Sequence, residues 1–166
     1  GVGKTRLALE AARVCAAPFA RTVFVSLAEI PHPALALSAL RRALTQLTGN
    51  ARIGVMLSLG RRHDRRSVPA LGRLLTGPDR ATAEAAAVAL GEIGDERAAR
   101  LLSKLPAATR QSWGTAYADA VLRCAERLAE SGHAADASRL VASLTAADQP
   151  RHVRAAATRW AGVAPK

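Results

Sequence analysis

Hydrophobic residues recur with helical spacing along most of this chain. Leu37, Leu40, Leu44 and Leu47 stand three or four residues apart and predict a helix over residues 35–47. Beyond this helix the periodicity remains helical, with short breaks at glycine and proline. We predict further helices over residues 51–60, 65–76, 80–92, 95–104, 107–131, 134–145 and 150–162.

The first third of the chain has a different pattern. Residues 3–16 predict a helix, and residues 22–27 (TVFVSL) have the β-branched and aromatic composition of a strand. A polar break at residues 48–50 separates this part from the helices that follow. We therefore expect two domains, a partial α/β segment over residues 1–49 and a mainly α domain over residues 50–166.

Two kinds of residue mark the ends of the central helices. Asp79 and Asp95 stand where predicted helices begin, and a carboxylate there accepts hydrogen bonds from unpaired backbone amides. Gly91 and Gly94 stand where another helix ends, and glycine permits a tight backbone at that point. We expect these four residues to set the boundaries of the central helices.

A repeat with a period of 31 residues runs through the centre of the chain. Leu59-Gly60 recurs as Leu90-Gly91, and Asp64 recurs as Asp95, each followed by an apolar stretch. A third and weaker unit, residues 137–144, follows the first at an offset of about 69–70 residues. A period of this length is typical of a solenoid, in which each unit buries its apolar face against its neighbours.

One string within the repeat is more specific than the period itself. Residues 90–95 read LGEIGD, and residues 59–71 follow the same order of Leu-Gly, Asp and an apolar helix. In these motifs, residues 51–162 resemble the short bacterial HEAT-like repeats of the phycobilisome-lyase type. The resemblance implies an α-solenoid of about three helical hairpins and a face on which another protein docks. No residue in the sequence supports lyase chemistry.

The N-terminal residues contain part of a phosphate-binding loop. Gly1, Gly3, Lys4 and Thr5 match the second half of the pattern Gly-x-x-x-x-Gly-Lys-Ser/Thr. In such a loop, backbone amides and the lysine hold the phosphates, and the threonine hydroxyl binds Mg²⁺. Residues 1–47 thereby resemble the nucleotide-binding segment of signal-transduction (STAND-class) ATPase regulators.

The loop is incomplete in this sequence. Its first glycine would precede Gly1, and no apolar run ends in the Asp or Asp-Glu that organises metal and water in such ATPases. We expect a fragment that hydrolyses no ATP, with no cofactor and no catalytic or metal-binding residues. If the upstream part of the loop is present in a longer parent, the resemblance implies that Gly1, Gly3, Lys4 and Thr5 bind ATP with Mg²⁺.

Composition and charge indicate nucleic acid as a second possible class of partner. The chain has 166 residues and a formal net charge of +11. Nine basic and two acidic residues give +7 to residues 1–62, and fifteen and eleven give +4 to residues 63–166. A basic surface attracts nucleic acid. The sequence shows no signal peptide and no membrane-spanning run, so we expect a cytoplasmic protein that does not bind membranes.

Isolated histidines, cysteines and aromatic residues offer few candidates for chemistry. The four histidines show no ligand spacing and no carboxylate partners in a metal pattern, so we expect them at the surface. The basic stretch at residues 61–66 is expected to be a solvated turn. Cys15 and Cys124 are expected to be buried thiols. For Cys124, a pKa lowered by the neighbouring arginines is the alternative.

The aromatic residues leave two roles open. Trp113, Tyr117 and Trp160 form either an interface patch or a cap on the open end of the solenoid. Altogether the sequence favours a non-enzymatic protein-interaction scaffold built on HEAT-like repeats. The alternative is a fragment of an ATP-binding signal-transduction or transcriptional regulator whose P-loop begins upstream of Gly1. Non-specific nucleic-acid binding through the basic surface is a third hypothesis, which we do not favour.

Overall fold

The computed structural model describes residues 10, 33–145 and 149–163. The chain divides into two compact units, Gly1–Val55 and Met56–Lys166. In the first unit the structure describes α2 (Pro33–Gln46) and the beginning of α3 (Gly49–Arg61), a helix that continues into the second unit. The helix predicted over residues 3–16 and the strand predicted over residues 22–27 lie outside the described residues.

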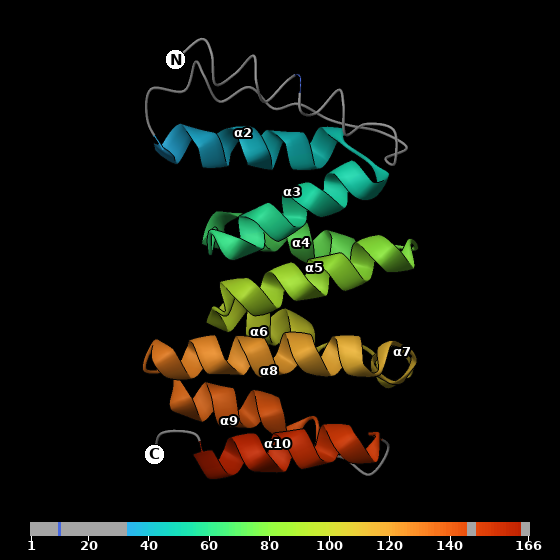
Figure 1. The fold of residues 1–166 in the computed structure, drawn as a ribbon, viewed down its shortest axis with the longest axis vertical. Coiled ribbons are helices and arrows are strands. Elements are labelled where there is room, and N and C mark those ends of the chain that lie inside the picture. The colour runs from blue at the N-terminus through green and yellow to red at the C-terminus, as the bar shows by residue number, and fades with distance from the viewer. Residues whose placement is uncertain (1–9, 11–32, 146–148, 164–166) are drawn as a thin grey trace. The chain divides into compact units, whose positions relative to one another are not determined.

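The second unit is helical throughout its described residues, which confirms the mainly α prediction for this part of the chain. Consecutive helices pair as the hairpins α3–α4, α5–α6 and α8–α9 (Figure 1). The elements after α3 are η1 (Arg65–Ser67, a 3-10 turn), α4 (Val68–Leu75), α5 (Arg80–Ile93), α6 (Glu96–Ser103), α7 (Ala107–Trp113), α8 (Thr115–Glu130), α9 (Ala134–Ala142) and α10 (Arg151–Val163).

The helices of the second unit form two layers. The A layer contains the end of α3, which touches α5 at Gly60 and Ala89, followed by α5, α8 and α10, each packing on the next. The B layer contains α4, α6 and α9, each packing on the next. In addition, α6 packs against both α5 and α8, α9 packs against both α8 and α10, and α4 packs against α5. Figure 1 shows α4 and α6 behind α5 and α8. This is the arrangement of a solenoid, because each hairpin buries its apolar face against the following one.

Leucines at repeated positions form the centre of this unit. Leu59 on α3 and Leu90 on α5 are both fully buried and lie 31 residues apart in the sequence. Leu71 on α4 and Leu102 on α6 have the same offset and are also fully buried. Each fully buried leucine contributes about 1.5–3 kcal/mol relative to an exposed one. The sequence period is therefore the spacing at which core residues recur in successive hairpins.

Two glycines allow successive A-layer helices to touch through their backbones. A Cβ atom on Gly60 of α3 would lie 2.9 Å from the Cα of Ala89 on α5. A Cβ atom on Gly91 of α5 would lie 2.6 Å from the carbonyl oxygen of Ala120 on α8. The two glycines and the two alanines are each 31 residues apart. The same backbone contact thus occurs twice along the stack, and neither glycine site has room for a side chain.

The turns that follow the A-layer helices α3, α5 and α8 each contain one residue in the left-handed region. These residues are His63 (φ 50°), Gly94 (φ 60°) and Gly132 (φ 85°). The expected role of Gly94 at a helix end is confirmed, since its amide donates to the carbonyl of Leu90. The same expectation for Gly91 is wrong, because Gly91 lies within α5 and its small size serves the contact with α8.

Aspartates begin two of the central helices, as predicted from the sequence. At the start of α5, Oδ2 of Asp79 accepts a hydrogen bond of 3.1 Å from the amide of Thr82. At the start of α6, Oδ1 of Asp95 accepts one of 2.7 Å from the amide of Ala98. Such a cap contributes about 1 kcal/mol by satisfying an amide that has no partner within the helix.

The single helix predicted over residues 107–131 is wrong, because the structure has two helices there, α7 and α8. Gly114 lies between them with φ 53° and ψ −115°, a conformation that residues with a side chain rarely adopt. The residues on both sides have helical periodicity, and an isolated glycine is tolerated within a helix. The hydrophobic pattern alone therefore did not indicate the break.

The backbone contact predicts that Gly91→Ala destabilises the protein. The new methyl group forces α5 and α8 apart, and overpacking of this kind raises the free energy of the folded state by about 1–3 kcal/mol. The matched control is Gly54→Ala on α3, where a Cβ atom meets nothing within 4 Å and the better helix former stabilises by about 0.5–1 kcal/mol. Urea denaturation measures both changes. Equal effects of the two substitutions would contradict the packing described here.

Candidate functional site

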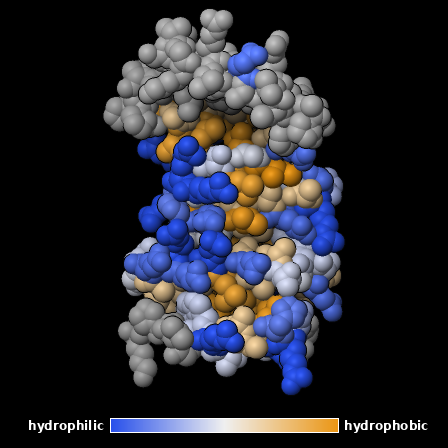
Figure 2. Space-filling model, viewed as in Figure 1, coloured by the Kyte–Doolittle hydropathy of each residue, from blue (hydrophilic) through white to orange (hydrophobic). Residues whose placement is uncertain are grey.

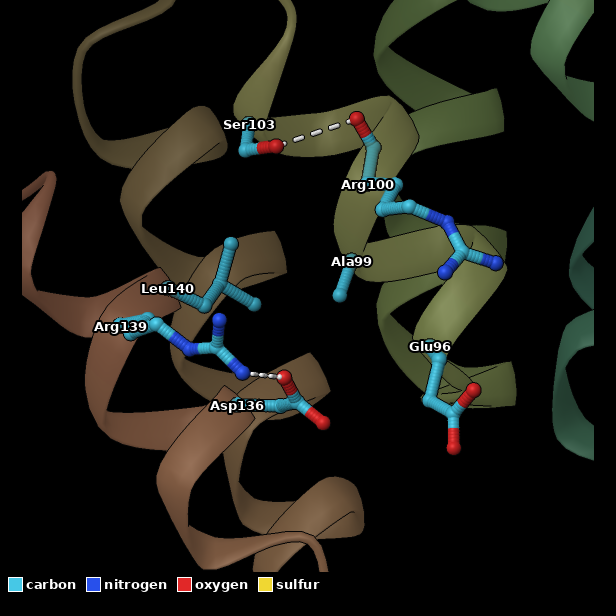
Figure 3. A pocket seen from close by; sticks show the side chains of 7 residues that line it. All are labelled: Glu96, Ala99, Arg100, Ser103, Asp136, Arg139 and Leu140. Carbon is cyan, nitrogen blue, oxygen red and sulfur yellow. Dashed lines mark hydrogen bonds and ion pairs between the residues drawn. The ribbon is translucent and has the colours of Figure 1, made fainter.

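The B layer contains an open groove between α6 and α9 (Figure 3). Its volume is about 370 Å³. The floor is apolar, since Ala99 and Leu140 are both buried. The residues that line it come from α6 (Glu96, Ala99, Arg100 and Ser103) and from α9 (Asp136, Arg139 and Leu140).

The rims of this groove are charged. Figure 3 shows Arg139 turned toward Asp136 on the same helix, and the guanidinium of Arg139 donates a hydrogen bond to that carboxylate. Arg100 extends from α6 in the direction away from α9. An apolar floor between charged rims fits the side chains of a docked polypeptide, whereas small-molecule sites enclose most of their ligand.

The turns before α6 and α9 determine where these two groove-lining helices begin. Asp95 caps α6 directly after the left-handed Gly94, and His133 occupies the corresponding position before α9, after the left-handed Gly132. The side chain of His133 does not cap its own helix. Nδ1 of His133 lies instead 3.2 Å from Oε1 of Glu96, at the start of α6.

His133 therefore belongs to a cluster that joins two hairpins. Its Nδ1 also lies 3.8 Å from Oδ2 of Asp136, and one ligand atom from each of Glu96, His133 and Asp136 falls within 4.8 Å of the others. The three side chains are exposed or half-buried, and Arg139 already binds Asp136. This arrangement is an exposed polar cluster that joins the starts of α6 and α9.

The interpretation that no carboxylate stands three or four residues from a histidine in a metal pattern is wrong for His133, because Asp136 follows it by three residues and lies near its ring. Glu96 comes from the preceding hairpin, so the sequence spacing of Glu96 and His133 gives no signal of their contact. The expected surface position is confirmed for His63, His133 and His152, which are exposed, while His32 lies outside the described residues. The sequence did contain one signal of this cluster, since Asp136 stands three residues after His133.

The basic turn at residues 61–66 is exposed at all its arginines, as expected, but it is not only solvated. Nδ1 of His63 lies 2.7 Å from the carbonyl oxygen of Glu92 on α5. Because a carbonyl oxygen only accepts, Nδ1 carries the proton in this contact. Asp64 within the same turn is buried. The turn thus joins its hairpin to the following one.

Arginines on α5 and α8 form ion pairs with carboxylates of α5. Arg80 lies 2.7 Å from Glu84 on α5, and Arg123 on α8 lies 3.2 Å from Glu92 on α5. Figure 2 shows that hydrophilic side chains and small hydrophobic patches alternate over α5 and α8 on the face in view. Exposed ion pairs of this kind contribute little stability. Because of these ion pairs, Arg80 and Arg123 are not available as unpaired cations.

The cysteine and aromatic candidates lie inside the fold. Cys124 is fully buried on α8, and burial, with a smaller contribution from the charge of Asp95, raises the pKa of its thiol to about 12. The prediction of a buried thiol is confirmed for Cys124, and the alternative of a lowered pKa is wrong. Tyr117 is fully buried and Trp113 nearly so, which excludes both from an exposed interface patch. Trp160 on α10 is half-buried.

The candidate nucleotide-binding residues Gly1, Gly3, Lys4 and Thr5, together with Cys15, lie outside the described residues. Their assignment stays a prediction. No described helix is both long and apolar enough to cross a membrane.

Comparison with known proteins finds a match to one repeat family. A family model described as HEAT repeats matches residues 37–118, which run from α2 to the first residues of α8. This supports the HEAT-like part of the resemblance. The match also includes residues 37–49, which the sequence analysis assigned to the first domain. No curated protein matches the chain.

The buried thiol predicts a pH dependence of stability. Because the pKa of Cys124 rises from 9.0 to about 12 on folding, the thiol favours the folded state below pH 9, and this contribution is lost as the pH rises toward 12. The free energy of unfolding of the wild type should fall more steeply above pH 9 than that of Cys124→Ala, by about 1.4 kcal/mol per pH unit. Urea denaturation between pH 8 and 10.5 measures both slopes. Parallel slopes would exclude a thiol ionisation linked to folding.

Proposed function

We propose that the unit Met56–Lys166 is a non-enzymatic scaffold that binds another protein in the groove between α6 and α9. The observation that carries the proposal is the groove itself, an open channel with an apolar floor formed jointly by two successive hairpins. HEAT repeats commonly bind other proteins, and a solenoid offers an extended face for this purpose.

The polar groups near the groove support binding better than catalysis. Ser103 donates its hydroxyl proton to the carbonyl of Arg100, 3.1 Å away, rather than to a base. The thiol of Cys124 is buried on α8, and its raised pKa keeps it protonated. Nucleophilic catalysis requires a side chain activated by a neighbouring base. The groove residues do not provide such a pair.

ATP binding at residues 1–5 is a separate hypothesis, motivated by Gly1, Gly3, Lys4 and Thr5. The scaffold proposal does not depend on it. A chain with an active nucleotide site at its beginning would still present the same groove.

The proposal predicts that filling the groove abolishes partner binding. Ser103→Trp places a large side chain on the exposed edge of the groove without changing the core. The control is Thr158→Trp on α10, where an exposed hydroxyl also bonds to a carbonyl of its own helix. Quantitative affinity capture should recover partner proteins with the wild type and Thr158→Trp, and at least tenfold less with Ser103→Trp. Circular dichroism should show equal helix content in all three proteins.

Two results would overturn the proposal. One is equal recovery of the same proteins by wild type and Ser103→Trp, which would place any interaction elsewhere. The other is recovery of no protein above background by the wild-type chain.

A further inference from the structure

The B layer displays cations that its own carboxylates leave unpaired. Arg66, Arg73, Arg97 and Lys104 are all exposed, and within residues 33–145 and 149–163 none of them forms an ion pair. Arg100 is likewise exposed and unpaired in this part of the chain. We define these five residues as the basic face of η1, α4 and α6. On α5 and α8, by contrast, Arg80, Arg123 and Arg127 form ion pairs with carboxylates.

These cations repeat with the period of the solenoid. Arg66 and Arg97 are 31 residues apart, and so are Arg73 and Lys104. Since α4 packs directly against α6, equivalent residues on the two helices are separated by about one helix spacing, roughly 8–10 Å. The basic face therefore presents two pairs of like charges, each pair running along the direction of stacking.

We propose that this face binds an acidic segment of a partner protein in an extended, polyproline-II-like conformation, with carboxylates at every third residue. The inference rests on the proposed scaffold function and names its partner class. A polyproline II helix has three residues per turn and rises about 3.1 Å per residue. Acidic residues at i and i+3 then lie on one side of the peptide about 9.3 Å apart, which matches the spacing of equivalent cations. A β-strand places residues i and i+3 on opposite sides.

The surroundings of the basic face favour a polypeptide over a nucleic acid. The adjoining groove has the apolar floor of Ala99 and Leu140, which accommodates side chains between the acidic positions. Proteins that bind single-stranded nucleic acids stack the bases on exposed aromatic rings. The described aromatic residues Trp113 and Tyr117 are buried, and Trp160 lies on α10. The basic face itself contains no aromatic residue.

Fluorescence anisotropy with the full chain and a labelled twelve-residue peptide, (Glu-Pro-Ala)₄, tests this inference. The double substitution Arg73→Gln with Lys104→Gln should weaken binding at least tenfold at 50 mM salt. The control Arg151→Gln with Arg159→Gln removes the same charge from exposed positions on α10 and should change the affinity less than twofold. A peptide of identical composition with its four glutamates adjacent should bind at least fivefold more weakly than the spaced peptide.

Three results would overturn the inference. Equal weakening by both double variants would indicate attraction by net charge alone, and equal affinity of the two peptides would exclude the matched spacing. A DNA duplex of 20 base pairs that binds more tightly than the spaced peptide, and loses affinity with the Arg73→Gln and Lys104→Gln variant, would assign the face to nucleic acid.

The same variants separate this inference from the scaffold proposal. If captured partners are lost with Ser103→Trp but retained with the Arg73→Gln and Lys104→Gln variant, the scaffold stands and the acidic partner is wrong. If partners are retained with both, the groove itself is not the docking site.

Discussion

The second unit depends on one constraint, the direct contact between the backbones of successive A-layer helices. Gly91 allows α5 to approach Ala120 on α8 so closely that no side chain fits at the glycine, and Gly60 allows the same approach of α3 to Ala89 on α5. Interiors packed at this density transmit small changes in volume to their neighbours. The contact fixes the distance between hairpins. The glycines and alanines that form it recur every 31 residues, which is the period seen in the sequence.

This constraint also determines what the B layer presents. Once the A helices are fixed relative to one another, the B helices occupy the positions behind them, and equivalent residues on α4 and α6 recur at one helix spacing. The cations Arg73 and Lys104 then form a repeated pair, and the groove beside α6 acquires its apolar floor. This open surface with a repeated charge pattern is the basis of the proposed scaffold role, since small-molecule sites enclose most of their ligand.

The sequence predicted the parts of the fold that depend on local signals. Asp79 and Asp95 cap helices as expected, because capping involves only the amides of the next turn. The break at Gly114 was missed because helical periodicity continues on both sides of it. The Glu96–His133 contact was missed because it joins different hairpins and therefore has no spacing in the sequence. The groove was not predictable either, since it depends on the separation of α6 and α9 rather than on a motif in either.

The central claim is tested most directly by proton–proton nuclear Overhauser effects in isotopically labelled protein. The account predicts strong cross-peaks between the Hα protons of Gly91 and Ala120, and equally between those of Gly60 and Ala89, because each pair of backbones is in contact. Absence of both cross-peaks in a folded, assigned protein would contradict the stacking of the A helices through their backbones.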